Sequence, residues 1–150
     1  MSINGRRFKK HVGHGFHFHR RRLGRKLKAE LEEIITTLEK LRNDADEATV
    51  ILVEGQKDKR ALKQLGVTGR ILSLQEFRKE IQTYLNAERV ILLLDFDEEG
   101  MSMYKRLKTR LEQQGFRVET FYYNRLGEIR RFGVYTIEEM GRYLSKVMHS

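Results

Sequence analysis

The chain of 150 residues contains no cysteine, which excludes disulfides and thiolate metal sites and leaves carboxylates and histidines as the strong metal ligands. Long hydrophobic runs are missing too. The longest apolar run is the five residues 90–94, whereas a membrane-spanning helix needs roughly 20. The basic N-terminus lacks the apolar stretch and cleavage site of a secretory signal. We therefore expect a soluble, cytoplasmic protein with no membrane partner.

Acidic residues are absent from the first 28 positions, which hold six arginines and four lysines and so carry +10. The other 122 positions hold 20 basic and 21 acidic residues, a net charge of −1. A basic tail beside a nearly neutral body suits a polyanion, and residues 1–22 lack the apolar helix face that membrane binding requires. We expect residues 1–24 to form a basic arm that binds nucleic acid, RNA in preference to DNA. Its cationic candidates are Arg6, Arg7, Lys9, Lys10, Arg20, Arg21, Arg22 and Arg25.

The arm also contains His11, His14, His17 and His19. They could bind zinc, but a structural site of four histidines without cysteine would be unusual, and the neighbouring glycines favour a segment without fixed structure. Contact with phosphates or RNA bases is our preferred interpretation. Such contact would strengthen as the histidines protonate below neutral pH.

Apolar residues recur at alternating spacings of four and three from about Leu23 onward, which predicts an amphipathic helix packed on the core. We expect this helix to end at Asn43 and Asp44. The stripe consists of Leu27, Leu31, Ile34, Leu38 and Leu41.

After residue 47, short β-branched runs alternate with helical periodicities in the order βαβαβαβα, which is typical of a parallel sheet. The predicted strands are residues 49–53, 70–72, 90–94 and 116–122, and residues 124–134 are predicted to form a loop. The first and third strands are apolar on both faces, as in central strands, and the last alternates like an edge strand.

Two capping boxes, Ser73 with Glu76 and Thr136 with Glu139, mark helix starts. The sequence therefore predicts an α/β fold: a four-stranded, mostly parallel sheet with helices on both faces, preceded by an N-terminal helix. We expect residues 25–150 to form one domain.

Three acids follow the predicted strands. Glu54 comes directly after the first strand, and Asp95 and Asp97 come after the third. Open α/β sheets bind their ligands beyond the carboxyl ends of strands. The single residue between the aspartates turns both carboxylates to the same side of an extended backbone. Clustered carboxylates repel one another unless a divalent cation neutralises them, and hard oxygen ligands select Mg²⁺ or Mn²⁺.

The residues beside these acids have structural interpretations as well. Gly55 and Gly100 permit close backbone approach or unusual dihedral angles. Asp58 could support the site or cap the following helix, and Glu99, like Glu98, suits the first turn of a helix. Any one of the acids, taken alone, is more simply a turn or capping residue. The convergence of two strand ends favours a metal site.

Two other metal motifs fit less well. Residues 95–100 look like the start of an EF-hand loop, but its twelfth position is Arg106 where a bidentate glutamate is needed, and a strand precedes it instead of a helix. Aspartyl phosphatases of the haloacid dehalogenase type usually place a threonine soon after an Asp-x-Asp pair on their first strand. Here Glu98, Glu99 and Gly100 follow the pair.

The pattern resembles the Toprim family, a domain shared by topoisomerases, bacterial-type primases, recombination proteins and some nucleases. That family has Glu-Gly after its first strand, matched by Glu54 and Gly55, and Asp-x-Asp-x-x-Gly after its third, matched by Asp95, Asp97 and Gly100. The resemblance covers roughly residues 48–125. Over the whole chain the sequence is similar to small stand-alone archaeal Toprim proteins of uncharacterised function, and this similarity implies a primase- or nuclease-like protein.

The resemblance implies that Asp95 and Asp97 hold one or two Mg²⁺ ions, for which Mn²⁺ may substitute, and that Glu54 is a further ligand or the general acid/base. A nuclease-like or RNA-processing activity on nucleic-acid phosphodiesters is then the expected function. Primase-like nucleotidyl transfer is a third candidate. The alternative is a non-catalytic factor that binds RNA or DNA, or acts in assembly, and keeps the metal site.

Overall fold

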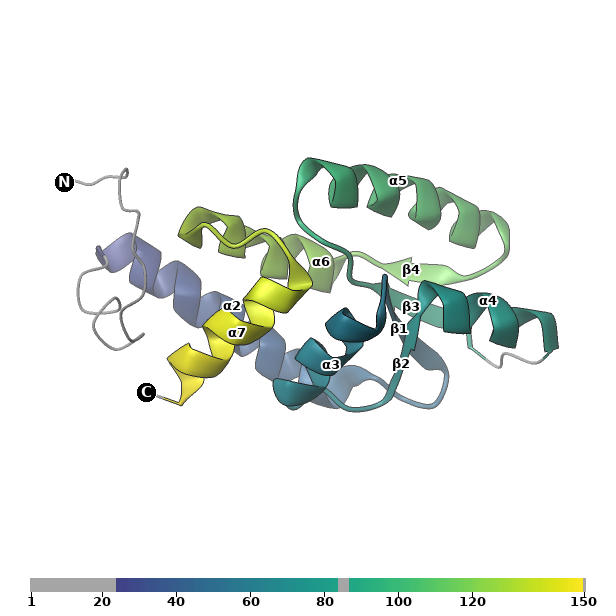
Figure 1. Ribbon diagram of the computed structural model, residues 1–150, viewed down its shortest axis with the longest axis horizontal. Helices are drawn as coiled ribbons and strands as arrows, with labels where there is room; N and C mark the ends of the chain where they lie inside the picture. The colour runs from purple at the N-terminus through teal and green to yellow at the C-terminus, as the bar shows by residue number, and fades with distance from the viewer. Residues whose placement is uncertain (1–23, 84–86, 150) are drawn as a thin grey trace.

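The computed structural model describes residues 24–83 and 87–149 (Figure 1). The four histidines of the predicted arm and its basic residues up to Arg22 lie outside the described residues, whereas Arg25 opens the first described helix. The helices are α2 (Arg25–Asp44), α3 (Gln56–Gln64), α4 (Leu74–Thr83), α5 (Glu98–Gln113), α6 (Phe121–Leu126) and α7 (Ile137–Met148), with a 3-10 helix η1 (Gly127–Phe132). The strands are β1 (Thr49–Val53), β2 (Arg70–Ser73), β3 (Arg89–Leu92) and β4 (Arg117–Glu119).

The four strands form one sheet in the order β2-β1-β3-β4, and each neighbouring pair is parallel. Leu52 of β1 pairs with Leu72 of β2 on one side and with Leu92 of β3 on the other. All five residues of β1 are buried, as expected for a central strand covered on both faces. The α/β fold with a four-stranded parallel sheet, predicted from the sequence, is confirmed.

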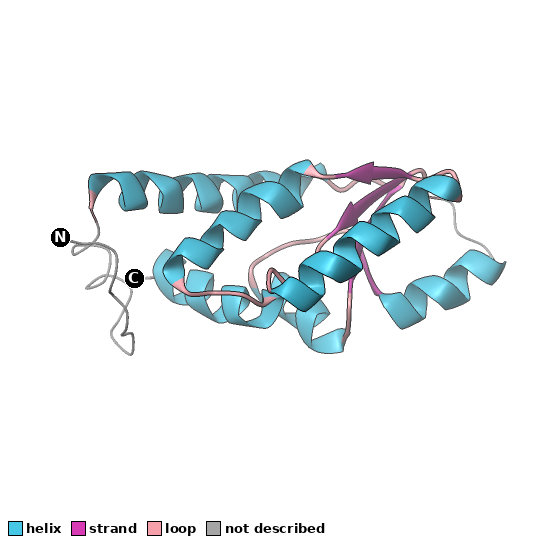
Figure 2. Cartoon of the chain, turned by 90° about the horizontal axis from the view of Figure 1, so that it is seen from above, coloured by secondary structure: helices cyan, strands magenta, loops and turns pink. Residues whose placement is uncertain are grey.

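Helices cover both faces of the sheet. The helix α3 connects β1 to β2, on one side of β1 in the sheet. The helices α4 and α5 connect β2 to β3 and β3 to β4, which runs across the sheet in the opposite direction. Because connections between parallel strands are right-handed, α3 lies on one face of the sheet and α4 and α5 lie on the other. Figure 2 shows the strands gathered between the helices. In Figure 1, α2, α6 and α7 lie to one side of the sheet, and α4 lies at the other end of the molecule.

The predicted amphipathic helix is confirmed as α2, which packs its apolar stripe against α6 and η1. Leu31, Leu38 and Leu41 of this stripe are fully buried. On the other side of the fold, α3 packs against α7 so closely that a Cβ at Gly141 would lie 2.9 Å from the Cβ of Ala61. No helix in the described part of the chain is both long and apolar enough to cross a membrane.

The prediction for the last strand was wrong in its extent. The strand β4 ends at Glu119, and α6 begins at Phe121, whose N–H donates to the Glu119 carboxylate at 3.3 Å. The alternation that favoured a strand as far as residue 122 already fails in the sequence, because Val118 and Phe121 are three positions apart and not two. That spacing belongs to a helix.

The loop predicted for residues 124–134 is mostly helical, since α6 continues to Leu126 and η1 follows directly. Tyr122, Leu126 and Ile129 are buried at spacings of four and three, which gives this segment an inward face against α2. The abundance of arginine concealed this short apolar stripe, and packing on α2 stabilises what would be a weak helix by itself.

The capping boxes differ in how completely they form. Ser73 and Glu76 satisfy each other's backbone N–H groups at 2.9 and 3.2 Å, as predicted. The hydroxyl of Thr136 accepts from the Glu139 N–H at 3.0 Å, but the Glu139 carboxylate accepts from the N–H of Tyr135 at 3.1 Å. In the second box the glutamate therefore binds the N–H of the residue before the N-cap, Tyr135, and not that of the N-cap Thr136 itself.

A polar network holds the amino-terminal edge of the sheet. Asp44, the last residue of α2, accepts from Arg89 of β3 at 2.8 Å and from the hydroxyl of Tyr122 in α6. Arg89 also pairs with Glu119 of β4 at 3.3 Å. The hydrogen bond from Arg89, followed by that from Tyr122, lowers the pKa of Asp44 below its usual 3.8. One carboxylate thus joins α2, the sheet and α6.

We predict that Asp44→Ala lowers the free energy of unfolding at neutral pH by about 1.5 kcal/mol, the lower end for hydrogen bonds to charged groups, because Asp44 is partly exposed. A lowered folded-state pKa stabilises the protein above the unfolded value of 3.8, and this contribution is lost as pH falls through the folded value. Urea unfolding of both proteins at neutral and at acidic pH measures the difference, which should shrink in acid. Glu47→Ala, an exposed change on the same side of β1, is the control.

Candidate metal centre

Glu54 stands at the carboxyl end of β1, where the buried strand reaches solvent. The side chain of Val53 is fully buried and that of Glu54 is exposed. The backbone carbonyl of Glu54 accepts from the N–H of Leu74 at 3.4 Å, which ties the turn after β1 to the start of α4. The end of this strand is therefore anchored to its neighbour β2, which Leu74 directly follows.

Asp95 lies at the same edge of the sheet, beyond β3. Its Oδ1 accepts from the backbone N–H of Ile137 at 2.9 Å, and its carbonyl oxygen accepts from the hydroxyl of Tyr123 at 2.9 Å. The next residue, Phe96, is buried and donates its N–H to the carbonyl of Tyr135 at 2.7 Å. Segments from the C-terminal third of the chain thus hold Asp95 in place.

Asp97 is the N-cap of α5, and its Oδ1 accepts from the N–H of Gly100 at 2.8 Å. A Cβ built on Gly100 would lie 2.1 Å from the carbonyl oxygen of Asp95, so only glycine allows the helix to begin there. The close approach predicted for Gly100 is confirmed. The prediction for Gly55 was wrong, since no atom lies within 4 Å of a Cβ there and its φ is −143°.

Asp58 caps the start of α3, because its carboxylate accepts from the N–H of Gly55 at 3.2 Å. This is the structural interpretation that the sequence left open for Asp58. Glu99 lies in the first turn of α5, also as expected. The charge of Glu99 raises the pKa of Glu54, and the charge of Glu54 raises that of Asp58, so Glu99 and Asp58 both lie within electrostatic range of Glu54 at this end of the sheet.

Burial and the charges of neighbouring acids raise the pKa of Glu54, Asp58 and Asp95. For Glu54 the largest cause is burial, followed by repulsion from Asp95, Glu99 and Asp97. Burial raises the pKa of Asp58 to about 6, and repulsion from Asp95 and Glu54 adds to the effect. Burial raises the pKa of Asp95 too, against the opposing effect of its hydrogen bond from the backbone of Ile137. Negative charge is therefore concentrated at this end of the sheet.

No pattern in the sequence indicated that α7 would join this edge. Glu138 and Glu139, in its first turn, raise the pKa of Asp95, and Glu138 also raises that of Asp58. The capping motif at Thr136 predicted that acids would lie at a helix start. No local signal places that helix beside β3, because its position depends on packing between α7 and α3.

These residues have the chemistry that a divalent cation requires. Asp95 and Asp97 each use Oδ1 in a hydrogen bond, and a carboxylate has a second oxygen that can bind a cation. Within residues 24–83 and 87–149, no three carboxylate or imidazole groups form a ready-made metal cluster. The charges of Asp95 and Asp97 raise the pKa of Glu54, which therefore lies within electrostatic range of both. Ligation by Glu54, Asp95 and Asp97 stays a prediction.

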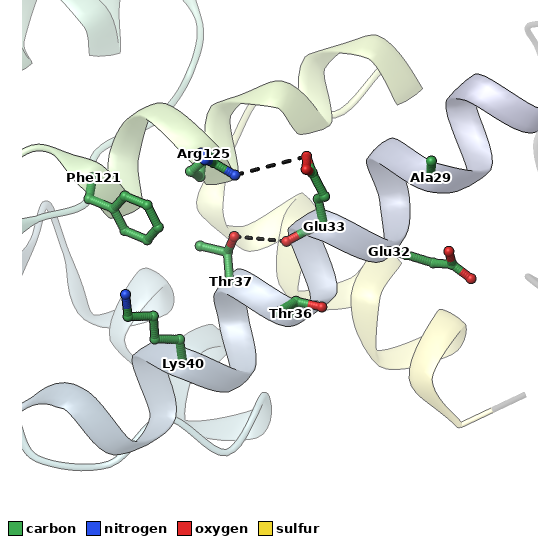
Figure 3. Close-up of a pocket in the computed structure, with 8 residues that line it drawn as sticks. All are labelled: Ala29, Glu32, Glu33, Thr36, Thr37, Lys40, Phe121 and Arg125. Atoms are coloured by element: carbon green, nitrogen blue, oxygen red, sulfur yellow. Dashed lines mark hydrogen bonds and ion pairs between the residues drawn. The ribbon is translucent and has the colours of Figure 1, made fainter.

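A groove of about 360 Å³ lies elsewhere, between α2 and α6 (Figure 3). In it Arg125 pairs with Glu33 at 3.9 Å, and the ammonium of Lys40 lies 4.7 Å from the ring centre of Phe121. The groove contains none of the acids that follow β1 and β3. We therefore assign it no part in the metal centre.

The fold and this acidic edge define a Toprim domain, and the comparisons agree. The Toprim domain model matches residues 49–122. A UPF0292 protein of Thermococcus sibiricus is 38% identical over 98 residues, which cover 63% of this chain and 78% of that protein. The chain belongs to the Toprim family, whose members generally bind divalent metals such as Mg²⁺ and function with nucleic acids.

Two further relatives are similar over most of their length. A UPF0292 protein of Methanocaldococcus jannaschii is 28% identical over 123 residues, which cover 77% of this chain and 92% of that protein. A solved structure of a putative protein from Aquifex aeolicus is 31% identical with a TM-score of 0.55, and the match covers 73% of this chain and 96% of that one. The similarity to small archaeal Toprim proteins, expected from the sequence, is confirmed.

We predict that Gly100→Ala destabilises the fold by about 3 kcal/mol, the upper end for overpacking, because the new Cβ would collide with the backbone of Asp95. Gly55→Ala is the matched control and should change stability little, since its surroundings are open. Thermal unfolding of both variants measures this. Equal stability of the two variants would contradict the close approach of α5 to Asp95.

Proposed function

We propose that this protein is a Mg²⁺-dependent enzyme that acts on nucleic-acid phosphodiesters, with a nuclease-like or RNA-processing activity. The observation that carries the proposal is the gathering of acids from two βα turns at one edge of a parallel sheet, where they raise one another's pKa. Membership of the Toprim family supports the same class of chemistry.

In this proposal Asp95 and Asp97 hold one or two Mg²⁺ ions, for which Mn²⁺ may substitute, and Glu54 completes the ligand set or moves a proton. Bound Mg²⁺ would stabilise the negative charge that develops on phosphate oxygens. The raised pKa of the Glu54 carboxylate suits a general base, because efficient proton transfer needs a pKa closer to the working pH. The carboxylate would accept the proton of the attacking water.

We also propose that residues 25–150 act as a single Toprim domain and that the arm, residues 1–24, supplies phosphate contacts. Ten positive charges in the first 28 residues favour a polyanionic partner, and we take RNA before DNA. The domain would then supply the chemistry and the arm much of the affinity.

A second candidate is a non-catalytic RNA- or DNA-binding factor, or an assembly factor, with the same metal site. One observation favours it: Asp58, Asp95 and Asp97 each accept a hydrogen bond from a backbone N–H at or beside a helix start, so each has a structural role that requires no catalysis. Primase-like nucleotidyl transfer is a third candidate that would use the same acids. It would be recognised by extension of an oligonucleotide in the presence of nucleoside triphosphates.

We predict that Glu54→Gln and Asp97→Asn each reduce Mg²⁺-dependent cleavage of labelled RNA or DNA by about 100-fold or more, the range for loss of a general acid/base. Both changes keep the size of the side chain, and asparagine remains a good N-cap for α5. Cleavage is followed with Mg²⁺, with Mn²⁺ and with a chelator on RNA and DNA substrates.

Glu98→Gln is the matched control, since Glu98 is an exposed acid in the same first turn of α5 and lies outside the proposed ligand set. It should leave cleavage unchanged. Full activity in both site variants, or equal activity with a chelator, would end the enzymatic proposal. Binding of Mn²⁺ without any turnover of nucleic acid would favour the non-catalytic candidate.

We predict that replacing Arg20, Arg21 and Arg22 with glutamine makes RNA affinity less dependent on salt. The slope of log affinity against log salt concentration should become shallower by up to about 2, because each lost phosphate contact on a single strand removes roughly 0.7. The control makes the same charge change on the body, at the exposed Arg106, Arg110 and Arg117. Fluorescence anisotropy at several salt concentrations gives both slopes. Equal slopes for the two triple variants would contradict a special role for the arm.

A further inference from the structure

Tyr135 is the one large apolar side chain left exposed in the described part of the chain, at 45% of its surface. It lies directly beside the acidic edge. Its carbonyl oxygen accepts from the N–H of Phe96, the residue between the two aspartates, at 2.7 Å. Its N–H donates to Oε1 of Glu139 at 3.1 Å. Two residues further on, Ile137 donates to Asp95.

The backbone of Tyr135 is therefore fixed on both sides while its ring faces solvent. Val134 before it is buried, and so is Ile137 behind it. An exposed aromatic ring on a fixed backbone loses little conformational freedom when a flat ligand stacks on it. Aromatic rings of this kind bind nucleic-acid bases without regard to sequence, because every base has a π face.

Arg130 supplies a positive charge near the same edge. Its Nε donates to the carbonyl of Gly127 at 3.0 Å, and its Nη1 lies 3.1 Å from Sδ of Met101, in the first turn of α5. Asp97 caps that same turn. Burial raises the pKa of Tyr123 to about 12, and the charge of Arg130 opposes that rise, so Arg130 lies near the tyrosine whose hydroxyl donates to the carbonyl of Asp95. The guanidinium is thus held beside the segment that contains the two aspartates.

The neighbouring arginine is engaged differently. Arg131 pairs with Glu30 at 3.0 Å and with Glu128 at 3.3 Å. Among residues 24–83 and 87–149, no carboxylate forms an ion pair with Arg130, which is exposed. Arg130 therefore keeps its charge available for an anion outside the protein, and a guanidinium is well suited to phosphate.

We propose that Tyr135 and Arg130 form a substrate-reading edge beside the acidic site, where the Tyr135 ring stacks on an unpaired base and Arg130 binds a phosphate of the same strand. The ligand is therefore single-stranded nucleic acid. This inference rests on the proposed function, because it assigns the substrate class to the same acids.

The preference for single-stranded over duplex nucleic acid follows from the geometry of stacking. A base inside a duplex already stacks on both neighbours, and exposing its face costs a few kcal/mol. A base in a single strand offers its face to Tyr135 without that cost. The acids that follow β1 and β3 repel phosphates, so a cation on the substrate side is needed to bring the strand close, and Arg130 is in position to provide it.

The first test uses the absence of tryptophan from the chain. In the full chain, Tyr135→Trp introduces a single indole whose fluorescence reports directly on stacking. We expect saturable quenching by short single-stranded RNA or DNA, and much weaker quenching by the same sequence as a blunt duplex. Inorganic polyphosphate binds the basic arm but has no bases, so it should leave the fluorescence unchanged. Binding of the oligonucleotide without quenching would overturn the proposal.

The second test measures affinity by anisotropy in a chelator, where no turnover occurs. Tyr135→Ala should weaken single-strand binding about 5- to 160-fold, the range for loss of one stacked base, and leave duplex binding unchanged. Tyr135→Phe should retain wild-type affinity, since the ring and not the hydroxyl makes the contact. Equal loss for single strand and duplex, or none for either, would contradict a base-stacking role.

A third test compares Arg130 with the adjacent Arg131, to distinguish a specific phosphate contact from a general effect of positive charge. Arg130→Gln should reduce the logarithmic salt slope of single-strand binding by about 0.7, the value for one phosphate contact, whereas Arg131→Gln should not change it.

Continued turnover together with unquenched fluorescence would reject the reading edge and leave the proposed function standing. Quenching without turnover of any substrate would reject the enzymatic proposal and retain the edge as a single-strand binding site.

Discussion

Parallel pairing of β1 with β3 is the constraint on which the site depends. Because the two strands are direct neighbours with Leu52 opposite Leu92, their carboxyl ends meet at one edge of the sheet about 4.8 Å apart. Glu54 and Asp95 are more than 40 positions apart in the chain, yet this pairing brings them to the same edge. An antiparallel arrangement of the same two strands would send the acids to opposite ends of the molecule. The buried apolar residues of β1 and β3 thus determine where the negative charge collects.

Helix starts offset part of the resulting repulsion. The N-terminus of α5 meets Asp97, and that of α7 meets Asp95. A helix N-terminus is equivalent to about half a positive charge, so two of them do not neutralise a cluster that also includes Glu54, Asp58 and Glu138. Burial is the largest cause of the raised pKa of Glu54, Asp58 and Asp95, and this imbalance shifts each of them further in the same direction. A divalent cation would neutralise the excess negative charge, whereas the hydrophobic core lies apart from it, around the buried strands and the stripe of α2.

The sequence was sufficient to predict the elements whose periodicity is local and regular. These include the stripe of α2, the buried central strands and the close approach at Gly100, since each depends on residue types within one segment. It was insufficient for α6 and η1, where Arg125, Arg130 and Arg131 masked a short apolar face that only contact with α2 makes stable. It also failed for the acids of α7, because tertiary packing alone brings that helix to β3. Gly55 shows a third kind of error: a glycine in a family motif whose surroundings turned out to be open.

The ring of Tyr123 stacks on that of Tyr104 in α5, with 3.9 Å between ring centres and 11° between planes, while its hydroxyl holds the carbonyl of Asp95. One side chain therefore joins the middle of α5 to an acid of the site. Since tryptophan is absent from the chain, tyrosine dominates its near-ultraviolet optical activity. Two rings this close and this nearly coplanar couple their transitions strongly. The molecule thus contains a chromophore pair of its own, and any ligand that shifts the backbone at Asp95 will change its circular dichroism without a label.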